Sequence, residues 1–268
     1  MERSRVDERG GARARPDTPN DFGGPTILDS PLVVAAAAVA AGAVAAVSGF
    51  GLGSILTPLL MLSFPTSSAV AIVAIPHAVA TTVRWWRLRA DVDGPTFRQF
   101  GIASALGGLA GAGLQPFLAT TALTILLAVL LMLAGGSELA RRRLPLPPTR
   151  FWRLAGGTLS GAFGGLVGNQ GGIRAAALLG FRLPPRALVA TATASALFVD
   201  AARVPIYVVT ARPALAANVE LWLAASVGAV IGTFIGTPIL GRIPEPIYRQ
   251  LIGGLLVLLG LALLVAAA

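Results

Sequence analysis

Long apolar segments follow one another from Pro31 to the end of the chain, separated by short polar, charged or glycine-rich stretches. A helix rises about 1.5 Å per residue, so an apolar segment of about 20 residues spans the hydrocarbon core of a bilayer. In the first half we predict helices over Pro31–Val47, Ser54–Leu62, Ser67–Val83, Phe100–Leu118 and Leu123–Leu139. In the second half we predict helices over Leu154–Val167, Ile173–Phe181, Ala187–Ala202, Leu221–Leu240 and Ile247–Val265.

The composition is typical of a membrane protein. Hydrophobic residues make up 55% of the 268 residues, charged residues make up only 12%, and the mean hydropathy is +0.76. Soluble domains carry about 25% charged residues, so this chain has too few charges to cover a water-exposed surface. We therefore expect an all-α, polytopic protein that lies in the lipid bilayer of the inner cell membrane and crosses it several times.

The two halves of the chain resemble each other. In each half a glycine-rich break precedes a segment that is too short to span the bilayer, Ser54–Leu62 and Ile173–Phe181. A Gly-xxx-Gly spacing, which lets membrane helices approach closely, also recurs in both halves. Residues match at an offset of 119 positions (168 minus 49) as Gly49 with Gly168, Gly53 with Gly172, Pro65 with Pro184 and Arg84 with Arg203. The ordered set indicates an internal duplication.

The arginine-rich loops predict the topology. They lie at Arg84–Arg98, Arg141–Arg153, Arg182–Arg186 and Arg242–Arg249, and basic loops face the cytoplasm. All four fall on one side if each short segment counts as a crossing; both termini then lie outside and the halves are inverted. We expect two inverted repeats, each of about five segments with one short broken helix, giving eight full spans and two short ones. Whether the short segments cross fully or are re-entrant stays open.

The domain boundaries follow from this pattern. Residues 1–30 are polar, and we expect them to form a disordered tail. Residues 31–140 form the first membrane repeat, 141–153 a basic, proline-rich connector, and 154–268 the second membrane repeat.

The composition excludes several kinds of chemistry. There is no cysteine, His77 is the single histidine, and all 21 basic residues are arginine. No metal-ligand cluster or P-loop lysine is available. The net charge of +9 does not indicate nucleic-acid binding, because the arginines lie between apolar segments and not on one basic face. We expect no cofactor, no metal, no catalytic residue and no nucleic-acid partner, and we leave a homo-oligomer open.

Three motifs resemble the TauE/SafE family of sulfite and organosulfonate exporters. Gly49–Leu60 reads GFGLGSILTPLL, Gly164–Gly172 reads GGLVGNQGG, and Ile75–Thr82 reads IPHAVATT. The resemblance covers roughly residues 33 to 265. It implies a membrane carrier of small anions, mostly sulfur oxyanions and sulfonates. Asn169 and Gln170 stand where many relatives are purely glycine-rich, so the resemblance does not fix the ligand.

The two glycine-rich breaks are the candidate substrate site. A break frees backbone groups within the membrane, which are tolerated only where they face protein or water. The N-termini of both short segments direct positive dipole ends at one cavity, which favours an anion. From the first break we predict binding by Gly49, Gly51, Gly53, Ser54 and Thr57, and from the second by Gly168, Asn169, Gln170, Gly171, Gly172 and Arg174. For Gly107, Gly111, Gly228 and Gly232 we favour a role in helix packing.

Charged residues inside apolar segments are functional candidates, because an arginine in a span costs about 2.5–3.5 kcal/mol. The planar fork of Arg174 suits a sulfonate or sulfite, unless the side chain reaches the interface. For gating or proton coupling we predict His77, Arg84, Asp200 and Arg203. The alternatives are a topology anchor for Arg84, a local ion pair for Asp200 and Arg203, and a neutral His77 bonded to an opened carbonyl.

These observations favour a secondary transporter or exporter of small anions such as sulfite, thiosulfate or organosulfonates, bound between the two broken helices. A non-transporting membrane scaffold or assembly factor is the first alternative. An intramembrane hydrolase that uses Ser54 and His77 is the second.

Overall fold

The computed structural model describes residues 30–48, 51–140, 149–240 and 244–268, and every regular element in these ranges is helical. The predicted tail, most of the basic connector, and Gly49 lie outside the described residues. The helices are α1 (Pro31–Ser48), α2 (Leu52–Leu60), α3 (Thr66–Leu88), α4 (Gly94–Thr96), α5 (Ile102–Leu114), α6 (Thr120–Leu139), α7 (Arg150–Val167), α8 (Gly171–Leu179), α9 (Pro185–Thr210), α10 (Arg212–Ala217), α11 (Val219–Leu240) and α12 (Glu245–Ala267). Short helical elements η2 (Arg89–Asp91), η3 (Phe97–Gly101) and η4 (Gln115–Phe117) flank α4 and α5.

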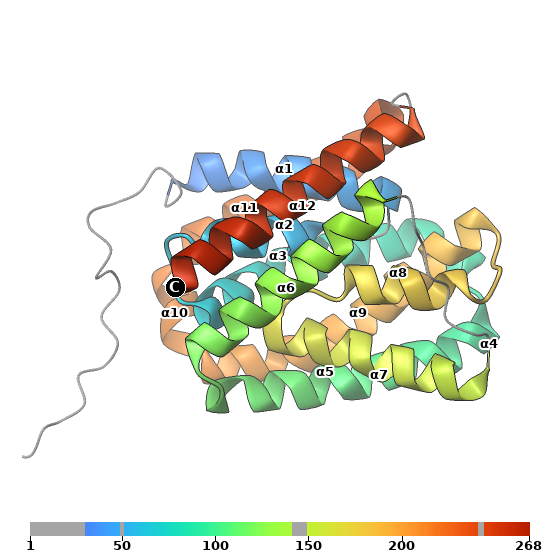
Figure 1. Ribbon diagram of the computed structural model, residues 1–268, viewed down its shortest axis with the longest axis horizontal. Coiled ribbons are helices and arrows are strands. Elements are labelled where there is room, and N and C mark those ends of the chain that lie inside the picture. The colour runs from blue at the N-terminus through green and yellow to red at the C-terminus, as the bar shows by residue number, and fades with distance from the viewer. Residues whose placement is uncertain (1–29, 49–50, 141–148, 241–243) are drawn as a thin grey trace, which may run out of the picture.

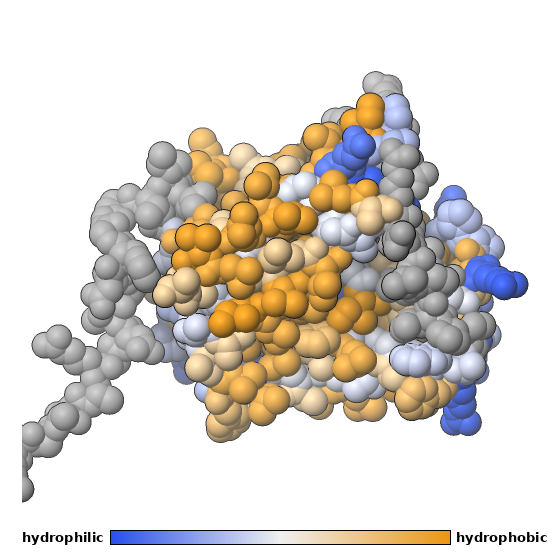
Figure 2. Space-filling model, in the orientation of Figure 1, coloured by the Kyte–Doolittle hydropathy of each residue, from blue (hydrophilic) through white to orange (hydrophobic). Residues whose placement is uncertain are grey.

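Six helices of the described part are long and apolar enough to cross a membrane, namely α1, α3, α6, α9, α11 and α12. The regular part of α5 is shorter because η3 and η4 flank it, and α7 carries Arg150 and Arg153 in its first turn. Large apolar side chains are exposed along most of the long helices. Figure 2 shows this apolar surface over α6, α12 and α5, with hydrophilic residues gathered at one end. The chain is an all-α, polytopic membrane protein.

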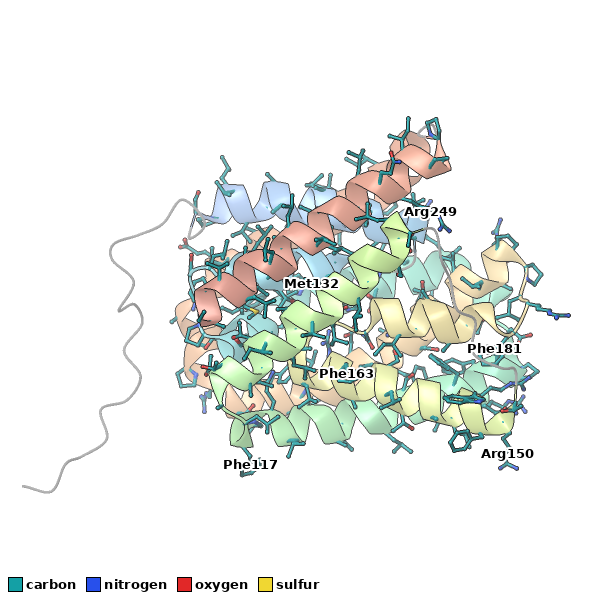
Figure 3. The ribbon with its side chains drawn as sticks, in the orientation of Figure 1. Phe117, Met132, Arg150, Phe163, Phe181 and Arg249 are labelled. Atoms are coloured by element: carbon teal, nitrogen blue, oxygen red, sulfur yellow. The ribbon has the colours of Figure 1, made fainter. Side chains whose placement is uncertain are left out.

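The long helices run roughly along the longest axis of the molecule (Figure 1). The first turn of α1 and the last turn of α12 lie at the same end. Arg150, which starts α7, and Arg249, near the start of α12, lie at the opposite end (Figure 3). The helices α1 and α7, which each precede a glycine-rich break, therefore begin at opposite ends of the molecule (Figures 1 and 3).

The most extensive helix contacts join the two halves of the chain. α1 packs on α11, α5 packs on α7, and α6 packs on α12. Glycines permit these contacts, as predicted: a Cβ atom on Gly107 or Gly111 would overlap backbone carbonyl groups of α7. Gly228 and Gly232 face backbone carbonyl groups of α1 in the same way. The packing role of these four glycines is confirmed.

The short segments α2 and α8 occur close to where the sequence places them, but α3 and α9 are longer than predicted. The predicted ends, Val83 and Ala202, each precede an arginine, whereas the helices continue to Leu88 and Thr210. Each predicted helix ends at the residue before its arginine. In the structure both Arg84 and Arg203 are buried, so the charges lie inside the helical bundle and do not mark its boundary.

Candidate functional site

Glycines allow the chain to interrupt two of its helices. The first break separates α1 from α2, and Gly51 there has φ of 131°. The second break separates α7 from α8, and Gly168 has a left-handed conformation with φ of 72°. Residues that carry a Cβ atom rarely adopt either backbone conformation. Glycine at these two positions therefore fixes where α2 begins and where α7 ends.

The two breaks meet in the interior of the protein. Ser54 in the first turn of α2 donates a hydrogen bond of 3.0 Å to the side-chain oxygen of Asn169 in the second break. A Cβ atom on Gly53 would overlap the carbonyl oxygen of Gly168, and one on Gly168 would lie 3.2 Å from the Thr57 hydroxyl. The absence of side chains on both glycines thus lets α2 pack directly against the second break.

The break residues provide polar groups that are buried from solvent. Ser54, Thr57, Asn169 and Gln170 are each at most 5% exposed. The Thr57 hydroxyl and both polar atoms of the Gln170 side chain have no hydrogen-bond partner in the described part of the chain. The first N–H groups of α8, from Gly171 and Gly172 onward, precede the regular helical bonds, which begin with Arg174 N–H to the Gln170 carbonyl.

A buried ionic network lies beside the breaks and joins α3 to α9. The Asp200 carboxylate lies 2.7 Å from His77 Nδ1 through one oxygen, and 3.0 and 2.9 Å from Arg203 Nε and Nη2 through the other. Arg203 also donates a 2.5 Å hydrogen bond to the carbonyl of Gly164 near the end of α7, and the Tyr207 hydroxyl donates to the carbonyl of Gly165. The network thus fixes the helix that leads into the second break.

Arg84 and Arg174 carry guanidinium groups that the protein does not fully satisfy. They are 4% and 2% exposed. Arg84 donates through Nη2 to the Thr81 hydroxyl at 3.0 Å, but its Nε and Nη1 have no partner among the described residues, and neither do Nε and Nη2 of Arg174. Both arginines interact electrostatically with Asp200. Three arginines and one aspartate therefore form a cluster with a surplus of positive charge.

The residue pattern of this chain matches a known family over most of its length. The family model described as "Sulfite exporter TauE/SafE" matches residues 34–263. The chain belongs to the TauE/SafE family. Its members are membrane transporters of the sulfite-exporter type, and the resemblance drawn from the three motifs is confirmed. No curated protein matches the chain. No solved structure matches it either.

In this TauE/SafE protein three interpretations of single residues need correction. The anchor interpretation of Arg84 is wrong, because its side chain is buried. Arg174 does not reach the interface for the same reason. His77 pairs with Asp200 and not with an opened carbonyl, although the predicted local ion pair between Asp200 and Arg203 is confirmed.

The Ser54 and His77 pair of the hydrolase alternative is not assembled in this protein. Ser54 donates to Asn169, and His77 Nδ1 contacts Asp200 and, at 3.4 Å, the Thr81 hydroxyl. No hydrogen bond joins Ser54 to His77 within the described residues. A serine needs a base within hydrogen-bond reach to become a nucleophile, so this arrangement gives the hydrolase no support.

Sequence reasoning missed two residues of the network. Thr81 holds Arg84, and Tyr207 holds the end of α7. Their spacing was a usable signal, because Thr81 follows His77 by four residues and Tyr207 follows Arg203 by four, which places each pair on one helix face.

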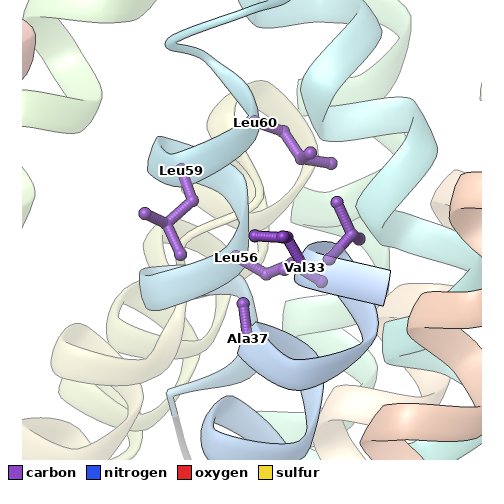
Figure 4. A pocket seen from close by; sticks show the side chains of 6 residues that line it. Val33, Ala37, Leu56, Leu59 and Leu60 are labelled. Atoms are coloured by element: carbon purple, nitrogen blue, oxygen red, sulfur yellow. The ribbon is translucent and has the colours of Figure 1, made fainter. Parts of the chain in front are cut away.

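A small pocket lies apart from this site, between α1 and α2 (Figure 4). Its lining consists of apolar residues only, Val33, Val34, Ala37, Leu56, Leu59 and Leu60. It offers no donor for an anion, so the candidate site remains the polar cluster at the breaks.

Proposed function

We propose that this protein is a secondary transporter that carries a small sulfur oxyanion or organosulfonate across the cell membrane. The substrate binds where the two broken helices meet, close to Arg174 and Arg84. The observation that carries the proposal is the set of buried guanidinium N–H groups without protein partners beside two glycine-rich breaks.

Physical chemistry favours an anionic occupant. A buried donor left without a partner costs about 1–3 kcal/mol, and more when it is charged. An oxyanion satisfies several such donors at once, because a guanidinium group binds two oxygens with parallel hydrogen bonds. The unpartnered Thr57 hydroxyl and Gln170 amide, together with the N-termini of α2 and α8, add further donors at the breaks.

The proposed architecture is a pair of inverted repeats with eight full spans and two short helices, α2 and α8. The helix packing supports it. α1 packs on α11. In the proposed repeats α1 corresponds to α7 and α11 corresponds to α5, and α5 and α7 also pack on each other. Two further contacts, between α3 and α9 and between α6 and α12, join a helix to its own mate. The opposite starting ends of α1 and α7 are consistent with inversion (Figures 1 and 3).

In this proposal the network of His77, Asp200 and Arg203 acts as a gate next to the site. It connects α3 of the first repeat to α9 of the second. Because Asp200 accepts hydrogen bonds from Arg203, an anion that enters next to Arg203 competes with it for that guanidinium group. Loss of that partner then changes the hydrogen bonding of Asp200, the residue that holds His77 of α3. The scaffold alternative requires neither the buried arginines nor the paired breaks.

Efflux from proteoliposomes tests the proposal. Sulfite, thiosulfate, taurine and a carboxylate control are loaded into vesicles with the wild-type protein, with Arg174→Ala and with Arg174→Lys. We expect saturable efflux of a sulfur anion that Arg174→Ala abolishes and Arg174→Lys restores in part, since lysine keeps the charge but loses the fork.

The matched control is Arg150→Ala, which removes an exposed arginine at the end of the molecule (Figure 3). It should transport like the wild type. Equal efflux with Arg174→Ala and the wild type, for every anion that is carried, contradicts the proposed site. No efflux of any sulfur anion by a folded wild-type protein contradicts the proposed function.

A further inference from the structure

The buried site carries more positive charge than one monovalent anion can neutralise. Arginine stays protonated in proteins, so Arg84, Arg174 and Arg203 contribute three positive charges against the single negative charge of Asp200. Asp200 is the acidic side chain that pairs with Arg203 and that acts on Arg84 and Arg174. The cluster therefore has a net charge of plus two with His77 neutral, and plus three with His77 protonated.

We propose that the site selects doubly charged oxyanions over singly charged ones of the same shape. This inference rests on the proposed function and names the charge of the substrate. A divalent anion neutralises the cluster when His77 is neutral, whereas a monovalent anion leaves at least one positive charge buried. At the effective dielectric constant of a protein, one unit charge at contact distance is worth several tenfold steps in affinity.

The geometry supports a preference for doubly charged anions, because two of the positively charged guanidinium groups have N–H donors without a protein partner. Asp200 is already shared between His77 and Arg203, so its two oxygens are both engaged. The free donors are those of Arg84 on α3 and of Arg174 on α8. An anion that approaches both arginines receives hydrogen bonds from two different helices, and each contributes a full positive charge.

Dehydration alone produces the opposite preference, which makes the test discriminating. A divalent anion loses far more hydration free energy on burial than a monovalent one. A site without a charge surplus therefore prefers the monovalent anion. Only compensation by the buried arginines reverses that order.

The test compares sulfate with methanesulfonate and with perchlorate, using binding to the purified full chain by calorimetry. All three probes are tetrahedral and keep their charge near neutral pH; sulfate carries two charges and the others carry one. We expect sulfate to bind at least about tenfold more tightly than either monovalent anion. Methanesulfonate or perchlorate binding as tightly as sulfate overturns the inference.

Two variants separate charge from shape. Arg84→Gln removes one charge and should reduce the sulfate preference at least about threefold, whereas Arg84→Lys keeps the charge and should retain most of it. Arg150→Gln is the exposed control and should leave the preference unchanged. A preference that Arg84→Gln leaves intact overturns the assignment of the surplus charge to this cluster.

The outcomes also separate this inference from the proposed function. Equal affinities for the three probes, together with sulfite efflux that depends on Arg174, overturn charge selection and leave the transporter intact. Failure of every anion, sulfite included, to bind or cross overturns both.

Discussion

Replacing Gly53 by alanine inserts a methyl group where the two breaks cross. The new Cβ atom overlaps the carbonyl oxygen of Gly168 and lies 3.5 Å from its carbonyl carbon. That oxygen is a backbone atom of Gly168, whose φ is 72°. It cannot rotate away from the new methyl group as the end of a flexible side chain could. Overpacking of this kind costs about 1–3 kcal/mol. The higher helix propensity of alanine offsets about 1 kcal/mol of this cost, so we expect a net loss of about 0–2 kcal/mol, with most of that range below the wild type.

The assay is unfolding of the purified protein in detergent, followed by tryptophan fluorescence, together with the affinity for sulfite. Gly53→Ala should lower the midpoint and weaken sulfite binding, because it separates Ser54 from Asn169. The matched control is Gly136→Ala in α6, where a Cβ atom meets nothing within 4 Å. That variant should gain about 0.5–1 kcal/mol. If both variants unfold at or above the wild-type midpoint, the contact between the breaks is not as the structure shows it.

Three further substitutions test other parts of the structure by the same unfolding measurement. Asp200→Asn removes the negative charge that faces the buried arginines and should cost about 3–5 kcal/mol. A loss no larger than that caused by replacing an exposed acidic residue with its amide would contradict the network. Tyr207→Phe deletes the hydrogen bond to the Gly165 carbonyl and should cost about 0.5–1.5 kcal/mol, and an unchanged midpoint would show that the bond contributes nothing. Asp93 caps α4, and hydrogen bonds from the side chain and backbone of Thr96 hold the pKa of its carboxyl below the ordinary value. Asp93→Ala should therefore cost about 0.5–2 kcal/mol near neutral pH; this contribution is present above the unfolded pKa and disappears as the pH falls through the lower folded pKa, so a difference from the wild type that persists in acid would refute the capping role.

The sequence predicted the membrane helices well because apolar segments of this length have few alternatives. The short helices α2 and α8 were also predictable, since glycine-rich breaks precede them. The ends of α3 and α9 were not, because hydropathy treats an arginine as a boundary. Inside the bundle, Thr81 accepts a hydrogen bond from Arg84, and Asp200 and the Gly164 carbonyl accept hydrogen bonds from Arg203. Thr81 and Asp200 each lie three residues before their arginine, so their spacing was readable, but the Gly164 carbonyl lies 39 residues away and is not visible in local sequence.

The candidate site was predicted in outline and not in detail. The contact between the breaks agrees with the predicted internal duplication, which places one break in each half. The pairing of His77 with Asp200 joins residues that lie 123 positions apart, and no periodicity connects them. Whether these residues bind substrate remains a prediction.

The helix contacts also determine which parts can move as rigid bodies. α1 is packed against α11 through glycines that bring the two backbones together, and α5 is packed against α7 in the same way. Each of these pairs takes one helix from either half of the sequence. The two halves are therefore interlocked, and neither can tilt as a unit against the other without breaking its closest packing. If transport exposes the proposed site to each side of the membrane in turn, the parts that move are therefore the α1–α11 and α5–α7 pairs and not the two halves of the sequence.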